Sequence, residues 1–341
     1  MIRSEQQTLV GLDIGTNSVK LVELSQSGRG YELERLALVP VGRGEHKESA
    51  ARALSMILES ESVAGRRVAT SVSGQHVAVR VLRFPELNKK EIEGAVWYEG
   101  SQVIAFDIDD AYVDYSVLDS VEPTDDGSPS RTDVLFVAAC KPDVEWRTDL
   151  LKQNGLEPRF MGVDMLVLLE AALRDPSMPK TFAVVNVGAA STGIGVTQGG
   201  ATPFVRDLEI GGNAVTEVIA GQMAISLPEA ETMKVTGESW TEETERAVED
   251  VVRRLVGEVH RSMVYYQTRS QGARVERVLL CGGSSRLSGL RESLETALSV
   301  EVEPWSPMRS ISVDGSRFDV PSVEQLSPFV ALAAALAMRT E

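Results

Sequence analysis

The sequence predicts an α/β protein in which two duplicated domains enclose one ligand. Three glycine-marked turns support this prediction, and each follows an apolar strand; they lie within residues 9–24, 182–196 and 275–285. The first two stretches share one design, a strand, a glycine turn with hydroxyl side chains and a second strand, about 170 residues apart. Such an internal repeat indicates a duplication. Glycine turns at the ends of apolar strands are typical of a cleft that binds a nucleotide.

The first turn carries groups suited to a phosphate. Gly15 can adopt a positive φ and leaves room for a ligand against the backbone, while Thr16 and Ser18 add hydroxyl donors. Asp13 precedes the turn, where it could hold a metal-bound water, and Lys20 could reach a phosphate. A plain β-hairpin with a surface aspartate and lysine is the alternative for this stretch taken alone, because short motifs give false positives.

Composition excludes several classes of function. The chain has 341 residues, enough for two or more domains with real cores. Its net charge of −16 argues against general nucleic-acid binding and against adsorption to anionic lipid by charge. Cys140 and Cys281 lie in apolar runs, which favours buried reduced thiols and a cytosolic compartment. The N-terminus lacks the apolar core of a signal peptide, and we expect no direct insertion into a membrane.

The first half of the chain alternates predicted strands and helices and contains a block that has the character of an insertion. Before the block, strands are predicted at 31–41, 68–72 and 77–84, and a helix at 48–60. The block begins with a helix that has Asn88 as its N-cap and Glu91 three residues later. A strand at 112–118, a polar loop at 120–132, a strand at 134–139 and a helix at 144–154, closed by Gly155, complete it. A strand at 161–163 and an apolar helix at 165–173 follow.

The second half begins with the repeated hairpin and is richer in helices. Predicted elements are a strand at 201–205 and helices at 214–223, 227–234, 241–267 and 287–298. The apolar stripe of the long helix at 241–267 has a 3.6-residue spacing, which favours packing in a core. A closing alanine-rich helix at 328–338 is too short to span a bilayer and lacks a basic face, so we expect it to pack in a core.

The order of the three turns points to the actin-like fold, and the chain resembles a narrower family within it. It is similar to the type IV pilus assembly protein PilM family, whose members are related to the division protein FtsA. The matching stretches are residues 11–15 with 18–24, 84–106, 137–141 through 155–158, 206–212 with 230–234, and 282–285. They cover nearly the whole chain in the family's order and spacing.

The resemblance implies an actin-like arrangement of duplicated, ribonuclease H-like domains with inserted subdomains 1C and 2B. Subdomain 1A would comprise residues 1–82, a return at 163–180 and a closing helix at 324–341, with subdomain 1C inserted at 83–162. Subdomain 2A would comprise residues 181–218 and 274–323, with subdomain 2B inserted at 219–273.

The resemblance also implies that ATP with Mg²⁺ binds between the domains. Asp13 would orient the Mg²⁺ through water. The residues expected at the β- and γ-phosphates are Gly15, Thr16, Asn17, Ser18 and Lys20, with Gly188 and Thr192 in the second phosphate turn. Gly211 and Gly212 would form the floor of the cleft, Glu231 and Lys234 would approach the ribose, and Gly282, Gly283 and Ser284 would approach the adenosine.

One departure from the family pattern bears on catalysis. The second phosphate strand usually carries an aspartate before its turn, and this chain has Asn186 there. An amide can hydrogen-bond water, but it is a poor base and a weak Mg²⁺ ligand. We therefore expect Asn186 to contact the ligand, ATP to bind with slow or no hydrolysis, and no catalytic residue to be present.

The resemblance implies a protein partner as well. Members of the family capture the N-terminal cytoplasmic tail of PilN in a groove between 1A and 1C and meet PilO and other platform proteins indirectly; self-association is a further option. The chain would then be cytoplasmic and peripheral to the inner membrane through its partner. Trp97, Tyr98 and Val103 could line that groove, or they could pack in a core.

Two other functions fit the superfamily. A small-molecule kinase would need a catalytic aspartate near the second turn, where this chain has Asn186. An FtsA-like filament-forming division protein usually has a linker and an amphipathic tail, whereas this sequence ends directly after its closing helix.

Overall fold

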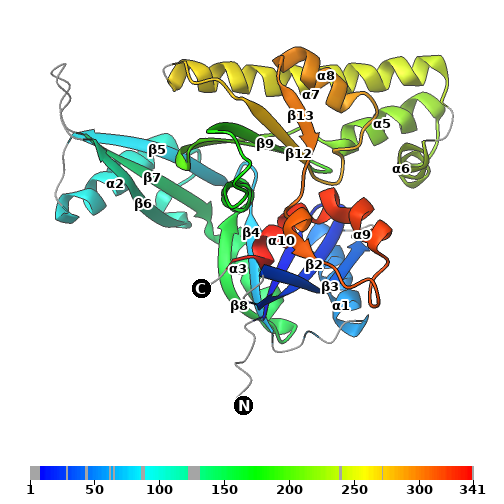
Figure 1. Cartoon of the computed structure of the whole chain (residues 1–341), viewed down its shortest axis with the longest axis horizontal. Helices are drawn as coiled ribbons and strands as arrows, with labels where there is room; N and C mark the ends of the chain where they lie inside the picture. The colour runs from blue at the N-terminus through cyan, green and yellow to red at the C-terminus, as the bar shows by residue number, and fades with distance from the viewer. Residues whose placement is uncertain are drawn as a thin grey trace.

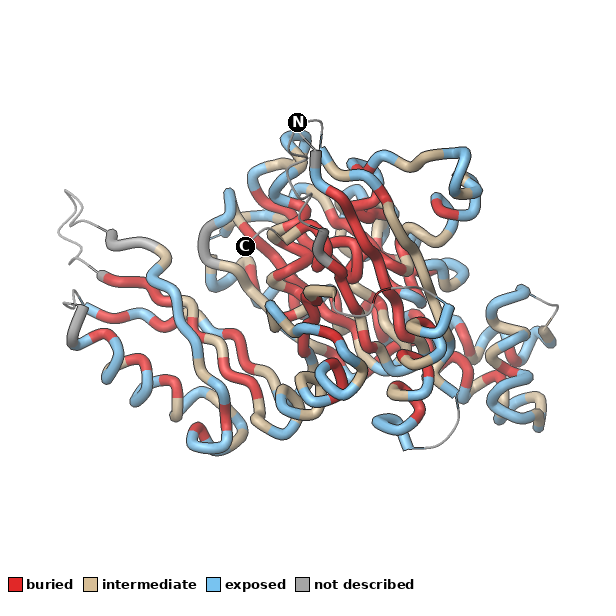
Figure 2. Tube along the Cα trace, turned by 90° about the horizontal axis from the view of Figure 1, so that it is seen from below, coloured by how far each residue is buried: buried red, intermediate tan, exposed pale blue. Residues whose placement is uncertain are grey.

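Two large β-sheets and one small one organise the chain. The computed structural model describes residues 8–27, 30–42, 45–60, 63, 66–85, 89–121, 131–237, 240–270 and 272–339. The two large sheets lie one above the other in Figure 1, and the small sheet projects to one side with its own helix. Most fully buried side chains belong to the two large sheets and the helices against them, as the tube in Figure 2 shows.

The first sheet has the order β14-β3-β2-β1-β4-β8. Its strands are β1 (Thr8–Ile14), β2 (Ser18–Ser27), β3 (Gly30–Pro40), β4 (Arg67–Val72), β8 (Glu157–Val163) and β14 (Ile311–Ser312). Alternation sends Val10 and Leu12 to the face covered by helix α1 (His46–Ser60), and Val22 and Leu24 to the opposite face, covered by α10 (Ala331–Ala337).

The second sheet has the order β11-β10-β9-β12-β13. Its strands are β9 (Thr181–Val187), β10 (Thr192–Gln198), β11 (Ala201–Leu208), β12 (Arg277–Cys281) and β13 (Glu301–Pro304). Helices α5 (Gly212–Met223), α7 (Glu242–Arg269) and α8 (Leu290–Leu298) share one core with its outer face. Helix α4 (Asp164–Leu173) and α10 pack on its inner face and so lie between the two sheets.

The small sheet is antiparallel, with the order β5-β7-β6, and it interrupts the first domain. The chain leaves β4, forms β5 (Val77–Pro85), α2 (Lys89–Val103), β6 (Ala111–Val121) and β7 (Arg131–Cys140), and returns through α3 (Lys141–Gln153) to β8. Helix α2 covers one face over a core that includes Phe84, Val96 and Phe136. We call this unit the inserted sheet; its strand β5 lies beside β11 of the second sheet.

Several details differ from the expectations. Strands β8 and β14 join the first sheet, although residues 157–162 and 311–312 fall in ranges expected for 1C and 2A. Leu150 and Leu151 of α3 likewise pack in the core of the first sheet, so the chain re-enters that domain before residue 163. Helix α8 begins at Leu290 rather than 287. The helix cap expected at Asn88 and most of the loop at 120–132 lie outside the described residues.

The C-terminal segment is a candidate membrane span by length and composition alone. It comprises residues Val320–Ala337. In the structure this run is divided into α9 (Val320–Leu326), a 3-10 turn (Ser327–Val330) and α10. Every residue of α10 is buried among the strands, which explains its composition as that of a core helix.

Candidate functional site

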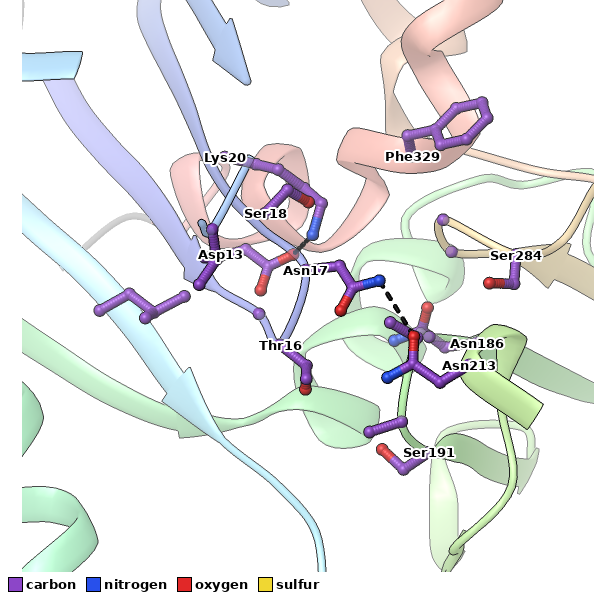
Figure 3. A pocket seen from close by; sticks show the side chains of 18 of the residues that line it. Asp13, Thr16, Asn17, Ser18, Lys20, Asn186, Ser191, Asn213, Ser284 and Phe329 are labelled. Atoms are coloured by element: carbon purple, nitrogen blue, oxygen red, sulfur yellow. Dashed lines mark hydrogen bonds and ion pairs between the residues drawn. The ribbon is translucent and has the colours of Figure 1, made fainter. Parts of the chain in front are cut away.

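A cavity of about 980 Å³ lies between the two large sheets. Its wall combines the first turn, the second turn, helix α6 (Leu227–Thr236), the turn after β12 and the segment before α10. All the predicted site residues line it except Thr192, Gly211 and Gly212. In Figure 3, Thr16 and Asn17 of the first turn face Asn186, Ser191 and Asn213 across the cavity. Both domains therefore contribute polar groups to one space.

The first turn is held by its own backbone and by one ion pair. The Gly15 N–H donates to the Ser18 carbonyl at 3.1 Å. Asp13 and Lys20 stand directly opposite each other on β1 and β2, which brings Lys20 Nζ to 2.8 Å from Asp13 Oδ2. The cation therefore neutralises the carboxylate, while the hydroxyls of Thr16 and Ser18 remain on the cavity wall.

The second turn repeats this geometry one domain away. The Gly188 N–H donates to the Ser191 carbonyl at 2.9 Å, as Gly15 does to Ser18. Counting from the two glycines, Asn186 corresponds to Asp13 and Ser191 to Ser18. Thr192 then corresponds to the buried Val19. Its hydroxyl donates to the Ile210 carbonyl at 2.7 Å and its side chain is fully buried, so the structure places Ser191, not Thr192, on the cavity wall.

The glycines that do not line the cavity allow close packing beside it. A Cβ on Gly211 would lie 2.6 Å from the carbonyl oxygens of Gly188 and Ala189, and a Cβ on Gly212 would lie 2.1 Å from Ser284 Oγ. Helix α5 can therefore begin directly against the second turn, where the Asn213 N–H donates to Ala189 at 2.7 Å. The Asn17 amide donates to Asn213 Oδ1 at 3.0 Å, a direct bond between the two domains (Figure 3).

Gly282, which directly follows β12, allows the backbone to pass close to Asn186. Gly282 has φ +99°, and a Cβ there would lie 2.4 Å from Asn186 Oδ1. The Cys281 thiol lies 3.9 Å from the same oxygen, and burial raises the pKa of that thiol far above its usual value, which keeps it neutral. Asn186 thus lines the cavity beside an uncharged thiol.

Lys234 is already engaged by protein groups. Its Nζ lies 2.6 Å from Glu231 Oε2, 2.9 Å from Thr216 Oγ1 and 3.2 Å from the Gly212 carbonyl. The side chain of Lys234 is only 8% exposed, whereas that of Glu231 is 38% exposed. Lys234 therefore orients Glu231, and the carboxylate is the group of this pair that can meet a ligand.

Sequence reasoning missed three carboxyl groups that line the cavity, Asp164, Asp207 and Glu217, and the first two have raised pKa values. Asp164 is the first residue of α4, next to the end of β8. Burial, followed by the negative charge of Asp13, raises the pKa of Asp164 to about 6, against the hydrogen bonds from Ser71 and Ser73. Burial also raises the pKa of Asp207, although the Gly74 N–H donates to its Oδ2 at 3.1 Å. An acid at a strand–helix junction was the available signal for Asp164.

These carboxyl groups make the site suitable for a cation that a ligand brings with it. Among the described residues, no group of three or more His, Cys, Asp or Glu side chains is close enough to hold a metal by itself. Mg²⁺ usually binds through one or two carboxylates, waters and substrate phosphates. Asp13 and Asp164, which both line the cavity and whose charges interact, fit that requirement.

The raised pKa of Asp164 predicts a pH-dependent stability. The folded state holds this proton up to about pH 6, whereas an unfolded carboxyl releases it near about pH 4. Ionised Asp164 therefore opposes folding at neutral pH, and the opposition disappears as the pH falls through that window. Without nucleotide or Mg²⁺, Asp164→Asn should exceed the wild type in free energy of unfolding by about 1–2 kcal/mol at about pH 7.5.

Urea unfolding of both proteins across this pH range measures the difference. The difference should shrink towards about pH 5. Asp149→Asn, on the exposed surface of α3, is the matched control for the loss of one carboxylate. A difference between Asp164→Asn and wild type that does not change with pH would contradict this account of the cavity.

Comparison with known proteins identifies the family. A family model described as type IV pilus assembly protein PilM matches residues 11–341. The chain belongs to this family. It is also similar to a solved chain titled "PilM-PilN type IV pilus biogenesis complex", with 29% identity, a TM-score of 0.83, and coverage of 97% of this chain and 98% of that one.

More distant structures share the fold alone. The ethanolamine utilization protein EutJ from Carboxydothermus hydrogenoformans has 18% identity and a TM-score of 0.56, over 97% of this chain and 89% of its own. A diol dehydratase-reactivating factor in nucleotide-free form has 10% identity and a TM-score of 0.55, over 97% and 99%. The actin-like fold predicted from the three turns is therefore confirmed.

Proposed function

We propose that this chain is an ATP-binding scaffold of the type IV pilus machinery that recruits the N-terminal cytoplasmic tail of a PilN-like membrane protein. The observation that carries the proposal is the similarity, over nearly the whole of both chains, to a protein solved as a PilM–PilN complex. The family assignment favours this function over a small-molecule kinase. The scaffold would be cytoplasmic and held at the inner membrane by its partner, with PilO and other platform proteins reached indirectly.

The two turns support ATP as the ligand. Their hydroxyls and backbone N–H groups would meet the phosphates, and Asp13 would orient Mg²⁺ through water, with Asp164 near enough for the two charges to interact. Mg²⁺ would supply positive charge to the phosphate oxygens. Glu231, oriented by Lys234, would approach the ribose, and Gly282 and its neighbours Gly283 and Ser284 the adenosine.

Slow hydrolysis of ATP is expected from the residue that precedes the second turn, Asn186. At the position that corresponds to Asp13, Asn186 offers an amide beside a neutral thiol, so it cannot accept a proton from an attacking water. We therefore expect ATP to act as a structural or switching ligand.

The inserted sheet supports the partner site between 1A and 1C. Trp97, Tyr98 and Val103 of α2 are 46%, 67% and 37% exposed, so the alternative that they pack in a core is wrong. Tyr112 and Tyr115 of β6 are exposed as well, at 49% and 38%. Exposed aromatic side chains are typical anchors of a protein interface.

Calorimetry on the full chain tests the ligand and the partner separately. We expect MgATP to bind with little phosphate release and a synthetic PilN tail to bind with measurable heat. Brisk, protein-dependent phosphate release would contradict the scaffold role, and no heat from the tail at high concentration would contradict the partner.

Tyr98→Ala should weaken binding of the tail about tenfold, because truncating an aromatic anchor commonly costs more than about 1 kcal/mol. Tyr265→Ala is the matched control, since Tyr265 on α7 is 47% exposed in the other domain. Equal losses of affinity in the two variants would contradict a site on α2.

A further inference from the structure

Helix α3 is the stem that attaches the inserted sheet to the first domain. Cys140, the last residue of β7, is the N-cap of α3, and Pro142 lies in the helix's first turn. A little over two turns later, Leu150 and Leu151 pack in the core of the first sheet. A shift of α3 would therefore move the inserted sheet relative to the first domain.

The first turn of α3 also holds the other end of the insertion. Asp143 Oδ2 lies 2.8 Å from His76 Nδ1, and the His76 carbonyl accepts the Cys140 N–H at 3.0 Å. His76 directly precedes β5, and Cys140 ends β7. Both chain crossings between the first domain and the inserted sheet are thus fastened to one helical turn.

The next turn of the same helix brings Arg147 to the wall of the cavity. Its Nη1 has a long bond of 3.4 Å to the Asp143 carbonyl, and its buried Nε has no hydrogen-bond partner among the described residues. The charges of Asp164, Asp143 and Asp13 act on it, and none of them forms an ion pair with it within the described part of the chain. Burial lowers the pKa of Arg147, so an anion in the cavity that it lines would stabilise its charged form.

Contacts of the neighbouring Trp146 connect Arg147 to the first turn. The Arg147 guanidinium carbon lies 5.3 Å from the centre of the Trp146 ring, and the His46 ring centre lies 6.2 Å from the same Trp146 ring centre. His46 Nε2 in turn lies 3.3 Å from the Gly15 carbonyl of the first turn. Arg147 and the first turn therefore belong to one continuous set of contacts.

We infer that Arg147 binds the terminal phosphate of the nucleotide, and that through α3 the bound nucleotide sets the position of the inserted sheet. The inference rests on the proposed binding of ATP in this cavity. The guanidinium lines the cavity and carries several N–H donors, and its charge balances the phosphate where Asp13 and Asp164 would otherwise repel it. The inserted sheet carries the proposed partner residues and is attached through α3. A ligand that fixes the position of α3 therefore also fixes the position of the inserted sheet.

Arg147→Gln tests the phosphate contact. Loss of a charge-assisted hydrogen bond to the terminal phosphate should weaken ATP binding about tenfold or more and leave ADP binding within about threefold of wild type. Calorimetry with MgATP and MgADP measures both affinities. Arg147→Lys keeps the charge and should recover part of the preference for ATP, and Lys152→Gln, an exposed cation on the same helix, is the matched control.

Hydrogen exchange tests whether the bound nucleotide acts on helix α3. In the wild type, MgATP should slow exchange in α3 and at the start of β5 more than MgADP does, and in Arg147→Gln this difference should vanish even at saturating ATP. If wild type binds neither nucleotide, the proposed function fails first. If wild type binds ATP and Arg147→Gln retains its ATP-to-ADP affinity ratio or the exchange difference, this inference alone is overturned.

Discussion

Substituting alanine for Gly11 is expected to lower the free energy of unfolding by about 4 kcal/mol or more. Gly11 lies in β1, on the face of the first sheet that α10 covers. A Cβ at this position would lie 1.9 Å from the Ala333 carbonyl oxygen and 2.5 Å from the Ala337 nitrogen. Both are backbone atoms of a buried helix, so no side chain can turn aside to make room, and α10 would have to leave its place between the sheets.

Urea denaturation of Gly11→Ala and wild type measures this loss. Gly94→Ala is the matched control, since Gly94 lies in α2 with nothing within 4 Å of its added Cβ. That change should leave stability unaltered or raise it by up to about 1 kcal/mol, because alanine is the better helix former. A Gly11→Ala protein with the wild-type midpoint would mean that α10 does not pack against β1 as the structure has it.

Gly11 also illustrates which parts of the fold the sequence could predict. The hairpins were predictable because alternation and a glycine turn are local signals, seen in 9–24 and again in 182–196. The partner of Gly11 was not predictable, since α10 begins at Ala331 and no local pattern links the two. The same reason applies to β14, whose two residues join the first sheet beside β3 from far along the chain.

The residues of the candidate site likewise divide into those that a local signal predicts and those that only the fold brings together. Gly15 and Gly188 were found because glycine marks a turn, and the turns proved to have equivalent backbone bonds. The choice of Thr192 over Ser191 was a register error, which counting residues from each glycine would have avoided. Arg147 belongs to no motif, and only the return of the chain through α3 and β8 brings it and Asp164 to the cavity.

Restoring a carboxylate in the second turn is expected to turn the proposed scaffold into a faster ATPase. Asn186→Asp should raise the rate of phosphate release at least about tenfold, because a positioned general base typically contributes about 10²–10⁴-fold. The substitution keeps the side-chain shape, and Asn186 already lines the cavity at the position matching Asp13. It also adds charge near Asp13 and Asp164, so ATP should bind more weakly without Mg²⁺ and regain affinity when Mg²⁺ is present.

Asn213→Asp is the control that separates base chemistry from added charge. Asn213 lines the same cavity and uses its side-chain oxygen to accept the Asn17 amide, a bond that aspartate preserves. It should show the weaker binding without Mg²⁺ but no gain in phosphate release, because it lies at the start of α5 rather than before the second turn. Asn186→Asp could bind MgATP and still hydrolyse it no faster than Asn213→Asp. In that case the amide at position 186 does not limit the rate of hydrolysis, and the position of the attacking water would be the limiting factor.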